Sequence, residues 1–269
     1  MDINSVEFVI EYVDDLEPVF GHINKCHNLQ KLFISYCDMK YPMIDFENIS
    51  RLSQLDFSYN QIIRIPNDIG CLVELTQLYL HHNQLMSLPN EIGNLIQLTK
   101  MDLCWNNLTS LPDTIGNLSN LISLDISHNW LSDFPDTNNM NKLTYLNFAA
   151  NKLEIFPDTL KKLSGLVELN LFQNRLVNFS YGSDSLIKLD LSGNRLENIV
   201  ICNLINLTEL NLAFNCLTSI PEFFCTNLTH LYLQFNLLES SPETVKKLTK
   251  LVDVDIRFNP FNYSSCFDY

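Results

Sequence analysis

The sequence predicts an α/β solenoid, in which short strands form one parallel sheet and short helical or irregular segments connect them. Three observations lead to this fold class. A leucine pattern returns at near-regular intervals, apolar and polar positions alternate within each copy, and three copies continue into a proline followed by isoleucine and glycine. One copy is too small to bury its own leucines, so neighbouring copies must stack.

The repeated pattern is L-x-x-L-x-L-x-x-N-x-L, and eleven copies of it follow one another. Val6 lies 23 residues before the first copy, so we predict that residues 1–28 form a degenerate N-terminal capping unit. Residues 29–261 then hold the eleven repeats, and residues 262–269 form a short C-terminal cap. The copies start at Leu29, Leu52, Leu75, Leu98, Leu121, Leu143, Leu166, Leu186, Leu207, Leu228 and Leu251.

The fourth and sixth positions of each copy predict a short strand with one buried face, because apolar residues such as Leu78 and Leu80 alternate there with polar ones. Strands of stacked copies then pair at ~4.8 Å. Pro89 ends the strand segment and suits the first turn of a short helix. Ile92 and Leu95 cover the interior from the outer side.

The ninth position is asparagine in every copy but the first, which has Cys37. An amide has donors and an acceptor, so it can pair with backbone groups that a turn would otherwise bury without partners. We therefore predict a structural turn column, which consists of Asn60, Asn83, Asn106, Asn129, Asn151, Asn174, Asn194, Asn215, Asn236 and Asn259.

On these motifs the chain resembles the leucine-rich repeat family along nearly its whole length. The 23-residue copies with L-P-x-x-I-G-x-L, complete at Ile69-Gly70, Ile92-Gly93 and Ile115-Gly116, are similar to the intracellular Ras-group subclass. Later copies depart from it, since residues 184–201 lack the L-P step. The resemblance implies a curved right-handed solenoid, or horseshoe, with a concave parallel sheet that binds protein and short helical or irregular convex segments.

The balance of acidic and basic residues restricts the kind of partner that the chain can bind. With 31 acidic and 17 basic residues the chain has a net charge of -14, which repels nucleic acid and anionic membranes. We expect another protein, neutral or basic, as partner, with no nucleic acid and no membrane. Self-association stays open.

The expected cellular location of the protein follows from its N-terminal sequence and its cysteines. The first 20 residues do not read as a signal peptide. The eight cysteines include no C-x-x-C pair and no terminal cluster. We therefore expect reduced thiols and an intracellular, cytoplasmic protein.

The candidate binding site follows from the strand pattern, since the third, fifth, seventh and eighth positions should reach the concave surface. The four consecutive copies that start at Leu52 have an aromatic eighth position beside acidic residues, and aromatic side chains in such a setting are typical of interface anchors. We expect the imidazoles of His82 and His128 to be held in the charged form by carboxylates, with a change of charge between about pH 6 and 7. The predicted partner-binding residues are Tyr59, Tyr79, His81, His82, Asp102, Cys104, Trp105, Asp125 and His128.

A second candidate patch is the aromatic column Phe214, Phe235 and Phe258. These rings can form a binding surface. They can equally pack on one another across neighbouring strands and stiffen the sheet.

Two chemical interpretations of the first site have less support. Cys104 with His81, His82 and His128 has the donor types of zinc, but no familiar ligand spacing. Cys104, His81 and Asp102 have the residue types of a hydrolytic triad, but they would lie side by side on an open face without oxyanion donors. We expect no metal, cofactor or catalytic residue.

The predicted function is a non-enzymatic protein-binding scaffold. The alternative is a regulatory or targeting subunit that presents a substrate to a separate enzyme, such as a ligase, a phosphatase or a member of a small GTPase pathway.

Overall fold

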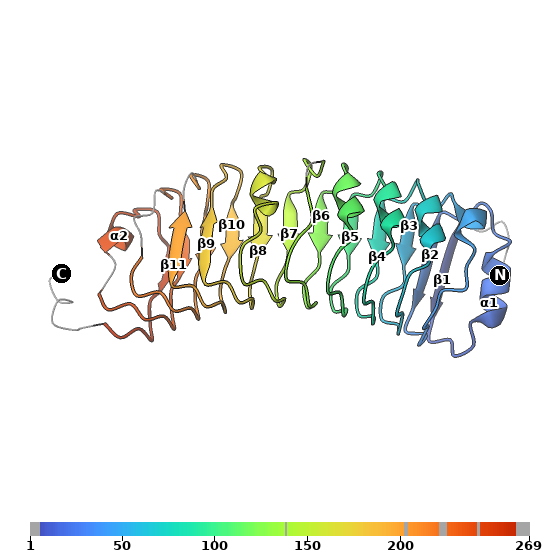
Figure 1. Ribbon diagram of the computed structural model, residues 1–269, viewed down its shortest axis with the longest axis horizontal. Coiled ribbons are helices and arrows are strands. Elements are labelled where there is room, and N and C mark those ends of the chain that lie inside the picture. The colour runs from blue at the N-terminus through green and yellow to red at the C-terminus, as the bar shows by residue number, and fades with distance from the viewer. Residues whose placement is uncertain (1–5, 138, 202–203, 221–224, 241–242, 262–269) are drawn as a thin grey trace. The chain divides into compact units, whose positions relative to one another are not determined.

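The computed structural model describes residues 6–137, 139–201, 204–220, 225–240 and 243–261, and the predicted C-terminal cap at 262–269 lies outside them. The chain divides into two compact units, Met1–Leu143 (unit 1) and Thr144–Tyr269 (unit 2) (Figure 1). Each helix in the described ranges falls short of the length and apolar content that crossing a bilayer requires.

The strands of unit 1 form a parallel sheet in chain order (Figure 1). The register is constant from one repeat to the next, so Leu55 lies opposite Leu78 and Leu78 opposite Met101. Each repeat position therefore forms a straight column across the sheet. The strands are β1 (Glu7–Glu11), β2 (Lys31–Ser35), β3 (Gln54–Asp56), β4 (Gln77–Tyr79), β5 (Lys100–Asp102) and β6 (Ser123–Asp125).

The connecting segments of unit 1 are short helices, mostly of the 3-10 type. Pro66, Pro89 and Pro112 stand immediately before three of them, with φ between -71° and -67°, where a missing N–H is tolerated. The helices are α1 (Glu17–Ile23), η1 (Phe46–Ile49), η2 (Asn67–Cys71), η3 (Asn90–Asn94) and η4 (Asp113–Asn117).

Unit 2 has a parallel sheet of the same kind and, in addition, a separate pair of strands, β9 (Asn178–Tyr181) with β11 (Asn198–Ile201). This pair stands where the copies are shorter and lack the L-P step. An extended strand covers ~3.3 Å per residue against ~2.0 Å for a 3-10 helix, so it spans the same gap with fewer residues. The main strands, in sheet order, are β7 (Tyr145–Asn147), β8 (Glu168–Asn170), β10 (Lys188–Asp190), β12 (Glu209–Asn211), β13 (His230–Tyr232) and β14 (Asp253–Asp255), and the helices are η5 (Leu160–Lys162) and α2 (Glu243–Lys246).

The core of each unit consists of the repeated apolar positions. Leu78 and Leu80 are fully buried, as are Ile92 and Leu95 from the helical side. Burying one such side chain contributes about 1.5–3 kcal/mol. The α/β solenoid with a parallel sheet, predicted from the sequence, is confirmed.

The asparagine column lies at the turn after each strand, where Asn60 to Asn236 are buried and Asn259 is half-buried. In Asn83, Nδ2 donates to Leu80 O (3.1 Å) in its own repeat and to Phe57 O (2.8 Å) in the preceding one, and Oδ1 accepts from Ile62 N (2.9 Å). One amide thus joins two repeats and pairs backbone groups of both.

The residue before each asparagine has a left-handed backbone, which the sequence did not predict. All eleven eighth positions have φ between +51° and +65°, although only Gly193 is a glycine. Such a conformation costs roughly 1–2 kcal/mol for an ordinary residue. The hydrogen bonds of the adjacent amide offset this strain.

Candidate functional site

Six aromatic side chains form a continuous stack in unit 1, where β1–β6 end. Neighbouring ring centroids lie 3.9–5.4 Å apart, and neighbouring ring planes are within 14° of parallel. The constant strand register explains this, because strands at ~4.8 Å place equivalent side chains at stacking distance. This aromatic stack consists of Tyr12, Tyr36, Tyr59, His82, Trp105 and His128.

The outer parts of these rings face solvent. Trp105 is 50% exposed and Tyr59 39% exposed, while His82 and His128 are half-buried. The candidate site predicted from the sequence contains these four residues, and the structure brings them together in one row.

The structure adds Tyr12 and Tyr36 to the row, with exposures of 71% and 44%. Sequence reasoning placed Tyr36 in the right column but not in the site. Tyr12 was missed because the capping unit was aligned on Val6, 23 residues before the first repeat, which would put Val13 in the aromatic column. In the sheet Glu7 lies opposite Lys31, a spacing of 24, so Tyr12 takes that place instead.

The fifth-position aspartates fold back onto the ends of their strands. Oδ1 of Asp56 accepts from Ser58 N (2.8 Å), Oδ1 of Asp102 from Cys104 N (3.1 Å), and Oδ1 of Asp125 from Ser127 N (2.9 Å). At the seventh position Ser58 and Ser127 are only 4% exposed, whereas Cys104 is half-buried. The expectation that the seventh position reaches the surface is therefore wrong for these two serines.

Tyr79, His81 and Cys104 are half-buried on the same face. The ring of His81 meets those of Tyr59 and Tyr79 edge-on, at 84° and 86°. Its Nδ1 lies 3.5 Å from Asp102 Oδ2, which is long for a hydrogen bond, and this buried nitrogen has no hydrogen-bond partner among the described residues. His81 and Asp102 therefore form an ion pair only when the imidazole is protonated.

The electrostatics of His82 differ from the expectation. Burial lowers the pKa of His82, repulsion from His81 and His128 lowers it further, and the carboxylate of Asp102 only partly opposes them. The prediction that His82 is held in its charged form is therefore wrong, because stacking between two rings removes water from the imidazole.

The chemistry available at Cys104 is limited. Its Sγ and the carboxylate oxygens of Asp102 and Asp125 lie within 4.8 Å of one another. This is not the zinc set considered above, Cys104 with His81, His82 and His128. Burial raises the pKa of Cys104, and both carboxylates raise it further, so the thiol stays protonated at neutral pH. Because the thiolate is the nucleophile and the metal ligand, this disfavours both chemical interpretations.

The second candidate patch, in unit 2, is a shorter stack of the same geometry. The ring of Phe235 lies 4.4 Å from that of Phe214 and 4.3 Å from that of Phe258, with planes within 11°. The three side chains are 42–65% exposed. The rings do pack on one another, as the structural interpretation requires, and they also present an apolar surface.

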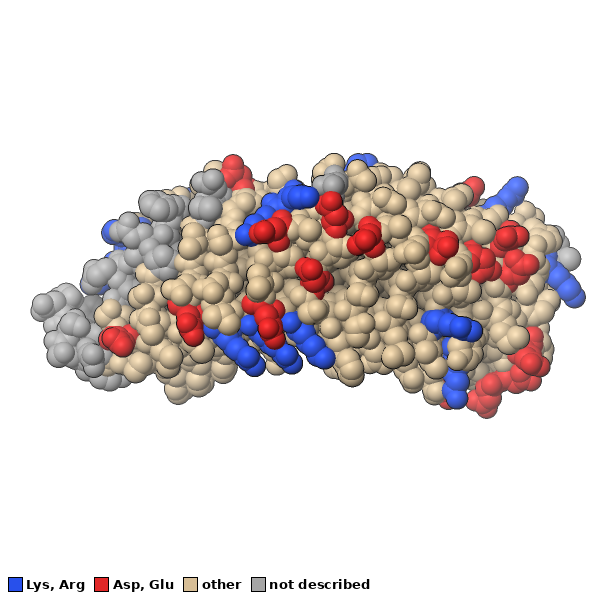
Figure 2. Space-filling view, viewed as in Figure 1, with Lys and Arg blue, Asp and Glu red and all other residues tan. Residues whose placement is uncertain are grey.

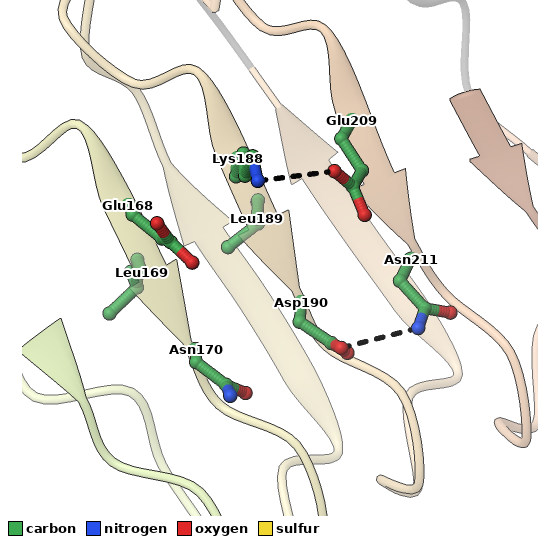
Figure 3. Close-up of a pocket in the computed structure, with 8 residues that line it drawn as sticks. All are labelled: Glu168, Leu169, Asn170, Lys188, Leu189, Asp190, Glu209 and Asn211. Carbon is green, nitrogen blue, oxygen red and sulfur yellow. Dashed lines mark hydrogen bonds and ion pairs between the residues drawn. The ribbon is translucent and has the colours of Figure 1, made fainter. Parts of the chain in front are cut away.

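Unit 2 also has a small polar cavity on its sheet, about 120 Å³ in volume (Figure 3). Lys188 Nζ lies 3.8 Å from Glu209 Oε2, and Asn211 Nδ2 donates to Asp190 Oδ2 at 3.2 Å. No sequence signal marked this cavity, because its polar residues are ordinary third- and fifth-position residues of the repeat and its two leucines are fourth-position core residues. It is lined by Glu168, Leu169, Asn170, Lys188, Leu189, Asp190, Glu209 and Asn211.

Comparison with known protein families agrees with this geometry. Models described as leucine-rich repeat match residues 45–85 and 97–118, and one described as two copies of leucine-rich repeats matches residues 184–225. No curated protein sequence matches the chain. The chain therefore contains leucine-rich repeats, and its fold is a leucine-rich repeat solenoid.

Three solved structures show how similar this chain is to proteins of known structure. The plant peptide hormone receptor RGFR1 in complex with RGF2 is 30% identical, with a TM-score of 0.67 over 88% of this chain and 45% of that one. The APL1 leucine-rich repeat domain is 22% identical, with a TM-score of 0.78 over 95% and 68%. TLR13 in its complex with ssRNA13 is 23% identical, with a TM-score of 0.74 over 92% and 38%. The chain thus spans less than half the length of RGFR1 and of TLR13, and the last two structures show the fold alone.

Proposed function

We propose that this chain is a non-enzymatic scaffold that binds another protein through the aromatic stack of unit 1. Proteins with leucine-rich repeats serve as protein-interaction scaffolds. The observation that carries the proposal is the half-exposed Trp105 held between two parallel rings. Stacking fixes the indole before a partner arrives, so less conformational entropy is lost on binding.

The proposed partner is a neutral or basic protein, without nucleic acid or membrane. The net charge of -14 supports this. In Figure 2 acidic side chains are spread along both units, and the clearest group of basic side chains lies at the lower edge of unit 2. Since TLR13 is described in complex with an RNA, single-stranded RNA is the competitor to test, and we expect it not to bind.

Replacing Trp105 by alanine tests the proposal. We expect the affinity for the partner protein to fall by at least about 2 kcal/mol, the usual threshold of an interface hot spot. The melting temperature should change little, because the side chain is half exposed. The measurement is titration calorimetry with a partner recovered by affinity capture and then purified.

Trp130→Ala is the matched control, since Trp130 is exposed to a similar extent, 53%, and lies outside the aromatic stack. It should leave the affinity unchanged. If Phe235→Ala abolishes binding while Trp105→Ala does not, the phenylalanine column of unit 2 is the site and the proposal is wrong.

We also propose an intracellular, Ras-group-like protein with reduced thiols. The motif at residues 88–95 supports the subclass, and six cysteines in the described residues form no disulfide: Cys26, Cys37, Cys71, Cys104, Cys216 and Cys225. We expect a reductant to leave the melting temperature unchanged. Alkylation of the unfolded, unreduced protein should label every cysteine, and a native disulfide in the intact mass would contradict the proposal.

A further inference from the structure

The sheet of unit 1 has an open edge at β1. In later strands the C=O at the fifth position faces the preceding strand, as where Asp102 O accepts from Leu80 N at 2.8 Å. Val9 holds this position in β1, which is first in the sheet order and pairs only with β2 in the described part of the chain. The backbone N–H and C=O of Val9, and of Glu11 two residues further on, therefore point to the open edge, where no described residue binds them. Such a row of backbone groups is a template for an added strand.

The aromatic stack ends at the same edge. One face of the Tyr12 ring lies against Tyr36, with centroids 5.1 Å apart, so its other face points away from β2. Tyr12 is 71% exposed, against 44% for Tyr36, which has a ring on each side. The phenylalanine column shows the same difference, since Phe235, between two rings, is less exposed than Phe214 and Phe258. The outer face of Tyr12 is therefore open to one more ring.

We propose that β1 and Tyr12 bind an extended, basic segment of the partner protein, which joins the sheet as a parallel strand and places an aromatic ring on Tyr12. The inference rests on the proposed function and specifies how the partner meets the aromatic stack. A parallel strand is favoured because β1 and β2 are parallel, and the rings that follow them stack on each other. Backbone hydrogen bonds along the edge provide affinity, and the aromatic ring and the charges provide specificity.

The side chains of β1 favour a basic segment. Residues 6–24 include five acidic residues and neither lysine nor arginine. Lys31 Nζ on β2 lies 3.8 Å from Glu7 Oε2, so one neighbouring strand already places a cation opposite this carboxylate. Basic residues on the added strand would lie opposite Glu7 and Glu11 from the other side of β1, and opposite charges across two strands stabilise a sheet. Between them Val9, which is 60% exposed, offers an apolar contact.

The test uses a hexapeptide, Lys-Thr-Val-Thr-Lys-Trp, with fluorescein at its N-terminus and an amide at its C-terminus. In parallel register its lysines lie opposite Glu7 and Glu11, its valine opposite Val9 and its tryptophan opposite Tyr12. The N–H of its fourth residue would then donate to Val9 O, whereas the N–H of its third residue points away from β1. Peptides that carry an N-methyl group on the fourth or on the third residue are therefore a matched pair.

We expect methylation of the fourth residue to weaken binding at least about fivefold, because a backbone hydrogen bond to Val9 is lost. Methylation of the third residue should change the affinity less than about twofold, because that N–H makes no bond to the protein. Fluorescence anisotropy measures both affinities. Equal effects of the two methyl groups would overturn the inference, as would absence of binding at peptide concentrations up to about 1 mM.

Replacing Tyr12 by alanine should weaken binding of the unmethylated peptide at least about tenfold, because the stacking contact and the apolar area of the ring are lost. Alanine suits the backbone there, since Ala150 has φ of 51° at the equivalent position. Tyr41→Ala is the matched control, because Tyr41 is also exposed and lies outside the aromatic stack, and it should leave the affinity unchanged. Equal losses in the two variants would contradict the inference.

Two further results would also contradict it. If sedimentation shows that the chain self-associates and that Tyr12→Ala abolishes this, a second copy occupies the edge. If Trp105→Ala weakens binding of the partner protein and Tyr12→Ala does not, the partner leaves the edge empty, and the scaffold proposal stands alone. The reverse result, a loss with Tyr12→Ala only, supports docking at β1 and removes Trp105 from the proposed function.

Discussion

Replacing Asn129 by alanine is expected to destabilise the protein by about 3 kcal/mol or more, since each buried group left without a partner costs about 1–3 kcal/mol. The side chain is 3% exposed and makes four hydrogen bonds with the backbone. Nδ2 donates to Leu103 O (3.0 Å), Ile126 O (3.1 Å) and Ser127 O (3.1 Å), and Oδ1 accepts from Leu108 N (2.9 Å).

Thermal and urea unfolding measure this loss. At roughly 2–4 °C per kcal/mol, the melting temperature should fall by roughly 6–12 °C. Asn117→Ala is the control, since Asn117 is exposed and its side chain has no hydrogen bond in the described structure. An unchanged melting temperature for Asn129→Ala would show that water replaces the amide at the turn.

Replacing Gly93 by alanine should have the second-largest effect, about 3 kcal/mol, because overpacking costs about 1–3 kcal/mol or more. A Cβ on this buried residue would lie 2.5 Å from Thr114 O and 2.6 Å from Thr114 Cβ, in the next repeat. Because one of these atoms belongs to the backbone, the two repeats must move apart. Differential scanning calorimetry measures the change.

Gly21→Ala provides a control of opposite sign. Gly21 lies in α1, and a Cβ there meets nothing within 4 Å. Alanine should stabilise that helix by up to about 1 kcal/mol. If both alanine variants lower the free energy of unfolding equally, the close approach of Thr114 is not what destabilises the Gly93→Ala variant.

The fold could be predicted from the sequence because the repeat constrains it many times over. Alternation at Leu78 and Leu80 fixes the buried face, and the constant spacing fixes the register. The strands β9 and β11 were not predicted, since the signal there was only the absence of the L-P step. The spacing assumed for the capping unit was one residue too short, because a single degenerate copy has no column to check it against.

The candidate site could be predicted only in part. Columns of residues showed that Tyr59, His82, Trp105 and His128 are neighbours, because register follows from the repeat. They could not show that the fifth-position carboxylates bind the backbone, or that burial lowers the pKa of His82. Both features depend on the left-handed backbone of the turn. The residue types before the asparagine do not predict that backbone conformation.

That turn also determines how the protein can change. Tyrosine, histidine, tryptophan, alanine, glutamine, glycine and phenylalanine all adopt φ between +51° and +65° at the eighth position. Valine, isoleucine and threonine, whose branched side chains suit such a backbone poorly, do not occur there. A mutation at this position can therefore exchange one recognition side chain for another while the scaffold stays the same, so new binding specificities are accessible in single steps.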